Sequence, residues 1–153
     1  MQIRLTDQSF DPQREEAAFA AGRAQMGALV SFVGLCRDNN DGAAVRQLHI
    51  DYYAGFTEKE IARLVQEVGT RFTCPDILVV HRVGDIVPGE AIVLVAALSH
   101  HRANAFDAVR VLMDYLKTDA PLWKKETGVQ GARWIEPRVE DYARRAEAEG
   151  KFP

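Results

Sequence analysis

The chain has 153 residues, of which 47% are hydrophobic, and its 19 lysine and arginine side chains against 22 aspartate and glutamate side chains give a formal net charge of -3 at pH 7. This length is typical of one domain built around one core. Because the charges nearly balance, no broad cationic face for nucleic acid or for an anionic membrane is expected, and any anion site must be local.

Three features bear on the compartment. The longest apolar run, residues 91–98, is far shorter than the roughly 20 residues that a membrane helix needs, and it is typical of a buried strand. Residues 1–16 carry charges and Pro12 but lack the apolar stretch of a secretory signal. Cys36 and Cys74 form no C-x-x-C pair, which fits free thiols in a reducing compartment and argues against a zinc ribbon. We therefore expect a cytoplasmic protein.

In chain order, the sequence first predicts a strand at residues 3–5 and a helix from Pro12 to about residue 25. Apolar segments at 28–36 and 45–53 flank a polar loop at 37–42 and predict a hairpin. Thr57 stands three residues before Glu60, which predicts a capping box at the start of a helix that ends near residue 72.

The rest of the chain predicts strands at 77–83 and 91–99, a third amphipathic helix at 103–116, and a hairpin of 123–126 with 132–135 around Gly128-Val-Gln-Gly131. Residues 138–153 are expected to form a polar C-terminal helix or tail. We therefore predict a single α+β domain over residues 1–153, with mainly antiparallel, hairpin-connected strands and three main helices.

Two lysines flank one predicted bend. Lys117 lies at the end of the third helix and Lys124 follows Pro121, close to apolar Leu122 and Trp123. A lysine that loses hydration in such a setting has a lowered pKa and can serve as acid, base or nucleophile. The alternative is that both are ordinary solvated lysines.

His101-Arg102 follows a predicted strand and opens the third helix, so a helix N-terminus, a guanidinium and an imidazole there could bind a phosphate or carboxylate. The alternative is a cap with a surface ion pair. At about 1.5 Å per residue, Arg102 and Lys117 lie about 22 Å apart in one chain. Either one cluster alone is catalytic, or a symmetric dimer brings the two ends together.

Other chemistries are less favoured. Cys36 beside Arg37 permits a thiolate nucleophile, but a thiol that ends an apolar strand more often packs as a small hydrophobe. The four histidines show no zinc-ligand spacing, so no metal and no cofactor is expected. The chain also lacks G-x-S-x-G, P-loop and G-x-G-x-x-G motifs.

Several short motifs run in order from about residue 28 to about residue 138: Phe32-Val-Gly-Leu-Cys-Arg37, Tyr53-Ala-Gly-Phe-Thr-Glu-Lys59, His81-Arg-Val-Gly-Asp85, Pro88-Gly89, His101-Arg102, Met113-Asp-Tyr-Leu-Lys-Thr118 and Pro121-Leu-Trp-Lys-Lys-Glu126. Together they resemble one family, the large, catalytic subunit of molybdopterin synthase (MoaE). Each motif is short, and their shared order makes the resemblance specific.

The resemblance implies an α/β hammerhead-type domain whose large subunits form a homodimer, with a small ubiquitin-like sulfur-carrier subunit at each end of a heterotetramer. It implies that the carrier's C-terminal thiocarboxylate gives sulfur to cyclic pyranopterin monophosphate, forming the dithiolene of molybdopterin. Sulfur would then come from the partner, which agrees with the lack of a persuasive catalytic cysteine here.

Carried over by motif, Lys117 and Lys124 resemble the catalytic lysines, and both also line the substrate pocket. The resemblance implies further substrate-binding residues, which are Arg37, His101, Arg102, Lys125, Glu126 and Arg138, the last expected to reach across the dimer. Leu122 replaces the aromatic residue that the family pattern has before Trp123, which changes the pocket wall more than the chemistry.

Two other functions remain open from the residues alone. One is a noncatalytic module that docks an acidic protein tail on its lysine and arginine side chains. The other is a Schiff-base lysine enzyme that acts on a phosphorylated carbonyl compound.

Overall fold

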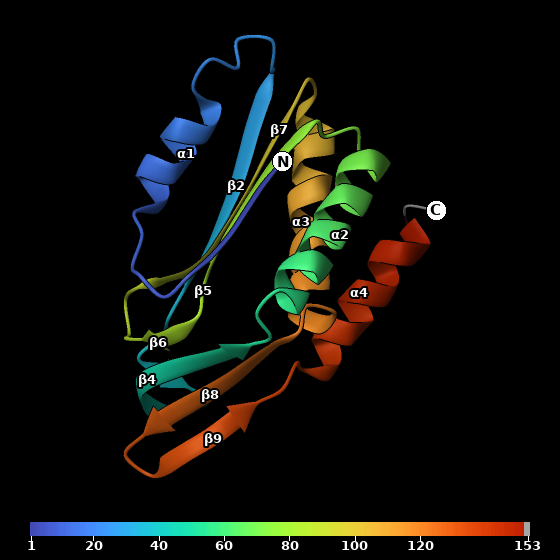
Figure 1. Ribbon diagram of the computed structural model, residues 1–153. Coiled ribbons are helices and arrows are strands. Elements are labelled where there is room, and N and C mark those ends of the chain that lie inside the picture. The colour runs from blue at the N-terminus through green and yellow to red at the C-terminus, as the bar shows by residue number, and fades with distance from the viewer. Residues whose placement is uncertain (152–153) are drawn as a thin grey trace.

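The computed structural model describes residues 1–151 (Figure 1). Its elements in chain order are β1 (Gln2–Thr6), α1 (Pro12–Ala20), β2 (Ala28–Leu35), β3 (Asn39–Asn40), β4 (Ala43–Tyr52), α2 (Phe56–Arg71), β5 (Asp76–Arg82), β6 (Gly84–Ile86), β7 (Ala91–Ser99), α3 (Arg102–Thr118), β8 (Leu122–Gly128), β9 (Gly131–Ile135) and α4 (Val139–Lys151). The predicted α+β class is confirmed. None of the helices in this part of the chain is both long and apolar enough to cross a membrane.

The main sheet has the strand order β1-β5-β7-β2, in which β1 lies parallel to β5 and the other neighbours are antiparallel. Its central strand β7 is the apolar run noted above, and both of its faces are buried. The helices α2 and α3 cover one face and α1 lies on the other (Figure 1), so hydrophobic side chains fill both sides of the sheet. This layered core fixes the position of α3.

The second sheet lies beyond the C-terminal end of α3 (Figure 1) and has the order β3-β4-β8-β9, with β6 paired to β4. Its β8–β9 hairpin turns through two residues, Val129 and Gln130, and Gly131 has φ 108, which favours glycine. A Cβ on Gly128 would lie 2.2 Å from the carbonyl oxygen of Ala44, so glycine is required for β8 to approach β4 there. The predicted hairpin around residues 128–131 is confirmed.

The polar C-terminal run forms the helix α4, which packs beside α3 (Figure 1), while residues 152 and 153 lie outside the described part of the chain. The guanidinium of Arg145 donates bidentate hydrogen bonds to the carboxylate of Asp119 at the end of α3, the shortest at 2.7 Å. Ala148 is fully buried, and its carbonyl accepts a 2.8 Å hydrogen bond from Arg71. Within residues 1–151, the helix expected as one of two alternatives for the C-terminal run therefore joins the three main helices.

The predicted pairing of segments 28–36 and 45–53 in one hairpin is wrong. β2 pairs with β7 in the main sheet, and β4 pairs with β6 and β8 in the second sheet. The polar loop between β2 and β4 therefore passes from one sheet to the other, and it carries the short strand β3. The physical reason is that apolar β2 pairs with the largely buried β7 at the centre of the main sheet, where its side chains join the hydrophobic core.

Two predicted helix ends also differ. The first helix stops at Ala20 because Gly22 adopts φ 72, a left-handed conformation that ends helices. The second helix begins at Phe56, and the carboxylate of Glu58 accepts a 2.6 Å hydrogen bond from the N–H of Gly55. Thr57 is therefore not the cap, and its hydroxyl donates to the carbonyl of Pro121 at 3.0 Å, which ties α2 to the bend before β8.

Candidate active site

Lys117 and Lys124 lie on either side of the bend where α3 ends and the second sheet begins. The C-terminal end of α3 carries Lys117, whose side chain is 47% exposed and whose Nζ lies 3.3 Å from Oδ1 of Asp141 on α4. The chain then turns at Pro121, which is held by Thr57, and re-enters as β8. The two amines are close enough for the charge of Lys117 to act on Lys124.

Lys124 is partly buried on β8. The pKa of its amine is lowered chiefly by burial, then by the nearby charge of Lys117, while the carboxylate of Asp141 acts in the opposite direction. Lys124 pairs in register with Ile50 and lies two residues from Leu122, which packs into the core between the sheets. Lys124 is therefore the lysine at this bend that loses hydration, as the sequence predicted for one of the two.

His81 lies in the buried part of β5, close enough to Lys124 for the charge of that lysine to act on it. Its pKa is lowered to about 4, mainly by burial, with a smaller contribution from the charge of Lys124. Its Nδ1 lies 2.7 Å from the carbonyl oxygen of Arg82, so the neutral ring donates its proton to that carbonyl. A neutral imidazole therefore belongs to the surroundings of Lys124.

A second group of side chains, the arginine cluster, lies further along the second sheet and consists of Arg37, Arg133 and Arg138 around Asn40 and Glu126. Glu126, two residues after Lys124 on the same strand face, accepts hydrogen bonds from Asn40 at 2.8 Å and from Arg133 at 3.3 Å. The side-chain oxygen of Asn40 in turn accepts from Arg37 at 3.3 Å and Arg138 at 3.4 Å. Three guanidinium groups thus converge on one buried amide and one carboxylate.

Arg138 joins this cluster to the lysines. Its guanidinium donates to both carboxylate oxygens of Asp41, at 2.9 and 3.0 Å. Its backbone N–H donates at 3.0 Å to Asp141, the residue that holds Lys117. In the single chain, Arg138 therefore bridges the arginine cluster and the start of α4.

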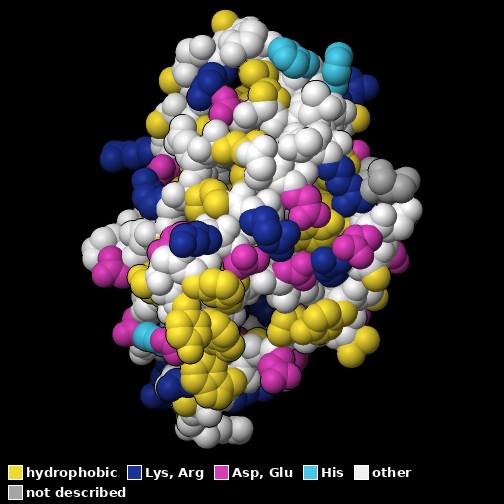
Figure 2. Space-filling model, turned by 45° about the vertical axis from the view of Figure 1, so that its right-hand side comes forward, with side chains coloured by type: hydrophobic (Ala, Val, Ile, Leu, Met, Phe, Trp, Pro, Cys, Tyr) yellow, Lys and Arg dark blue, Asp and Glu magenta, His cyan; other side chains and the backbone are white. Residues whose placement is uncertain are grey.

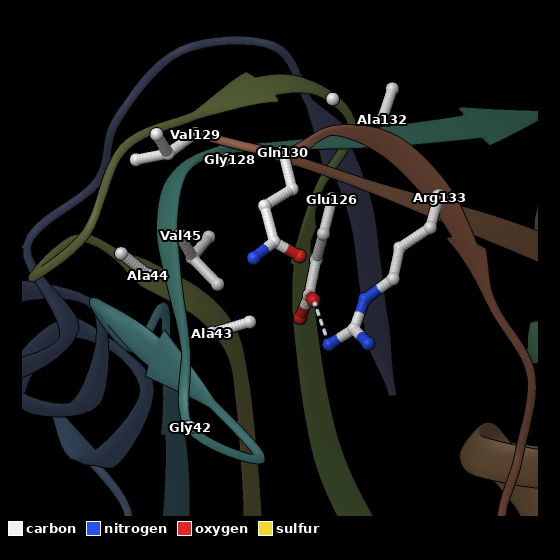
Figure 3. Close-up of a pocket in the computed structure, with 11 residues that line it drawn as sticks. Gly42, Ala43, Ala44, Val45, Glu126, Gly128, Val129, Gln130, Ala132 and Arg133 are labelled. Carbon is white, nitrogen blue, oxygen red and sulfur yellow. Dashed lines mark hydrogen bonds and ion pairs between the residues drawn. The ribbon is translucent and has the colours of Figure 1, made fainter.

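A cavity of about 260 Å³ opens beside the arginine cluster (Figure 3). Figure 3 shows Glu126, Gln130 and Arg133 pointing toward one another at the cavity, with the ion pair of Glu126 and Arg133 drawn as a dashed line. The wall consists of Gly42, Ala43, Ala44, Val45, Glu126, Gly128, Val129, Gln130, Gly131, Ala132 and Arg133. Much of it is backbone and small side chains, which leaves room for an extended chain or a small anion.

Lys125 does not lie with Lys124 and Glu126. Successive side chains of a strand alternate between faces, and Nζ of Lys125 lies 5.5 Å from the ring centroid of Trp134 on the outer face of the second sheet. Tyr53 and Trp123 make an edge-to-face ring contact at 5.4 Å. Figure 2 shows hydrophobic side chains gathered over the part of the molecule that this sheet occupies.

His101 and Arg102 lie at the other end of α3. Figure 2 shows histidine side chains at the upper end of the molecule, away from the second sheet. His101 precedes the helix without a side-chain cap, both residues are exposed, and Arg102 has no ion-pair partner within residues 1–151. The single chain therefore does not bring Arg102 to Lys117, and the alternative of a local surface ion pair is not realised either.

The preference for packing at Cys36 agrees with the structure. Cys36 is 5% exposed in a cluster with Leu48, Ile50 and Ile86, and burial, followed by the charges of Glu126 and Glu90, raises the pKa of its thiol. A raised pKa disfavours the thiolate. No group of three His, Cys, Asp or Glu side chains in the described residues is placed to hold a metal ion.

With this geometry in view, the relatives of the chain can be compared. A model of the family described as MoaE protein matches residues 5–119, and the chain therefore belongs to the MoaE protein family. The molybdopterin synthase catalytic subunit of Caulobacter vibrioides is 50% identical over 141 residues, which cover 92% of this chain and 93% of that protein.

Solved structures share the fold. A molybdopterin biosynthesis MoaE protein from Burkholderia ambifaria superposes with a TM-score of 0.80 at 40% identity and covers 99% of both chains. A chain from a protein–protein complex of subunits 1 and 2 of the Helicobacter pylori molybdopterin-converting factor has a TM-score of 0.75 at 19% identity, covering 89% of this chain and 91% of that chain.

Sequence reasoning missed four residues of this region, which are Asn40, His81, Arg133 and Asp141. The signal for Arg133 was present, because a two-residue turn between Gly128 and Gly131 pairs Glu126 with Arg133. The other three residues depend on contacts between distant segments. No local pattern identifies such contacts.

Proposed function

We propose that this protein is the catalytic subunit of a molybdopterin synthase, which transfers sulfur from the thiocarboxylated C-terminus of a small ubiquitin-like carrier to cyclic pyranopterin monophosphate. The observation that carries the proposal is that Lys117 and Lys124 flank one bend beside the arginine cluster, close enough for their charges to interact, in a member of the MoaE family. The proposal includes catalysis in the cytoplasm, supported by the unpaired cysteines Cys36 and Cys74.

The charges fit the reactants. A thiocarboxylate and a phosphate are both anionic, and cationic side chains at the end of a narrow site bind and orient such groups. An ammonium group can protonate an oxygen that leaves as sulfur is transferred, and a neutral amine can accept a proton. Lys117 and Lys124 are the groups we propose for these steps, with Arg37, Glu126 and Arg138 lining the route of the carrier tail.

The geometry also supports a homodimer. Arg102 and Lys117 lie at opposite ends of α3, so one small substrate cannot contact both within one chain. We propose that His101 and Arg102 of one large subunit complete the site that contains Lys117 of its mate, with one carrier at each end of the resulting heterotetramer.

The direct test mixes the protein with thiocarboxylated carrier and cyclic pyranopterin monophosphate and measures the dithiolene product. We expect Lys117→Ala to lower the rate at least about 100-fold, since a positioned acid or base contributes roughly that much. Lys59→Ala, which removes an exposed lysine on α2, is the matched control and should keep full activity. Normal product formation by Lys117→Ala would contradict the proposed role.

A Schiff-base lysine enzyme is the second candidate, and the lowered pKa of Lys124 favours it, because a neutral amine can attack a carbonyl. Borohydride reduction would trap a carbonyl substrate on Lys124 if this reading holds, and it would leave the protein mass unchanged if sulfur transfer is the function. A noncatalytic docking module would show no heat of binding with the pterin precursor in isothermal titration.

A further inference from the structure

The ammonium group of Lys117 is held by a buried carboxylate from another helix. Oδ1 of Asp141 lies 3.3 Å from Nζ of Lys117, and Asp141 is 7% exposed. Oδ2 accepts a 3.0 Å hydrogen bond from the N–H of Arg138, so the first turn of α4 fixes the orientation of the carboxylate. Burial acts to raise the pKa of Asp141, but the Arg138 N–H and the charge of Lys117 outweigh it and leave the pKa lowered.

Lys124 has no such partner. Within residues 1–151, its amine makes no ion pair and no hydrogen bond, although it is more deeply buried than Lys117. An unpaired amine that is shielded from water favours its neutral form, whereas the ammonium group of Lys117 is 47% exposed and lies against a fixed carboxylate. The two lysines of the site therefore stand in different electrostatic settings.

The other charged groups around the pair do not replace Asp141. Asp114 on α3 has a raised pKa, mainly because of burial, and its nearest guanidinium contact is Arg110 at 3.9 Å. Arg144 on α4 lies 3.7 Å from Asp141 and adds positive charge, and His81 on β5 is neutral near pH 7. Glu126 on β8 is engaged by the arginine cluster. Asp141 is thus the carboxylate of this region that directly contacts Lys117.

We propose that Asp141 is a positioning residue of the active site: its carboxylate fixes Lys117 as an oriented ammonium group, while Lys124, the unpaired and more deeply buried amine of the pair, is the one that gives up its proton. Lys117 then acts as the hydrogen-bond donor and cationic anchor, and Lys124 acts as the proton acceptor. The catalytic roles assigned to the two lysines rest on the proposed function. The contact of Asp141 with Lys117 does not depend on it.

Asp141→Asn is the informative variant. The amide keeps one oxygen that can accept from the N–H of Arg138, but it removes the charge that faces Lys117. α4 stays anchored elsewhere, by Arg145 on Asp119 and by the buried Ala148. Glu140→Gln removes the same charge one residue earlier, from an exposed side chain in the same turn, and is the matched control.

The first experiment measures the pKa of Lys124 by NMR titration of protein labelled with ¹³C at lysine Cε. Asp141→Asn should lower the pKa of Lys124 by about half a unit to one unit, because a nearby favourable charge is removed. Lys117→Met should raise the pKa of Lys124, since it removes a like charge. Glu140→Gln should change neither. An unchanged Lys124 titration in Asp141→Asn would overturn the proposal.

The second experiment measures sulfur transfer against pH. Asp141→Asn should lose at least about tenfold in kcat and shift its acidic limb to lower pH, and Asp141→Glu should recover part of the rate because it restores the charge. If Asp141→Asn matches Glu140→Gln in rate and pH profile, Asp141 has no positioning role. If Lys117→Met also retains full transfer, the proposed function itself fails, and the NMR titration still decides whether Asp141 sets the charge of the pair.

Discussion

At position 81 an imidazole is buried in a strand whose other side chains are mainly hydrophobic. His81 is 4% exposed, and burial lowers its pKa to about 4, whereas an unfolded chain would have a histidine pKa near 6.5. Between about pH 4 and pH 6.5, the unfolded chain therefore binds a proton at His81, whereas the native protein does not. The stability that depends on neutral His81 is therefore complete above about pH 6.5 and is lost as the pH falls toward 4.

We predict that this linkage costs about 2 kcal/mol of unfolding free energy between pH 7 and pH 5. Urea unfolding of the wild type and of His81→Gln at both pH values measures it, and the stability difference between the two proteins should shrink by that amount at pH 5. His49 acts in the opposite direction, because hydrogen bonds with Asp85 and Asp51 raise its pKa. Since His49 is present in both proteins, its contribution cancels. A pH-independent difference would show that His81 titrates normally.

Among the strands, the β8–β9 hairpin places Lys124, Glu126 and Arg133, and its approach to β4 depends on Gly128. A Cβ at this position would lie 2.2 Å from the Ala44 carbonyl oxygen, which is backbone and cannot rotate away. We predict that Gly128→Ala destabilises the fold by about 1–3 kcal/mol, as overpacking does elsewhere. Equilibrium urea unfolding checks this value.

Gly150→Ala is the control for that substitution. Gly150 lies in α4, and nothing stands within 4 Å of an added Cβ, so alanine should be neutral or stabilise the helix by up to about 1 kcal/mol. Equal unfolding midpoints for Gly128→Ala and Gly150→Ala would contradict the close approach of β8 to β4.

The β8–β9 hairpin shows which parts of the fold can be predicted from local sequence patterns. Its glycines at 128 and 131 fix a two-residue turn, so its strands and register follow from the sequence. The partner of β2 does not follow, because an apolar strand can pair with any other apolar strand, and burial beside β7 decided the choice. Lys117 and Lys124 stand out through their bend, whereas Asp141 belongs to a polar run whose docking against α3 depends on tertiary contacts.

In a single chain, Arg102 lies too far from Lys117 to serve the same site. α3 spans the main sheet with Arg102 at one end and Lys117 at the other, about 22 Å apart at about 1.5 Å per residue. If Arg102 completes the site of a second copy, each site of the dimer contains residues from both protomers. The second copy is then part of the catalytic machinery and not only a support.

Subunit complementation tests this composite site. Lys117→Ala and Arg102→Ala should each lose most activity alone, and their mixture, after exchange of subunits, should regain about a quarter of the wild-type rate. Half of the dimers in a random mixture are mixed, and each mixed dimer keeps one of its two sites intact, while the other site carries both substitutions. Light scattering confirms the dimer, and size-exclusion chromatography of differently tagged variants confirms exchange. A mixture that shows only the average of its two components would mean that Arg102 and Lys117 never serve the same site.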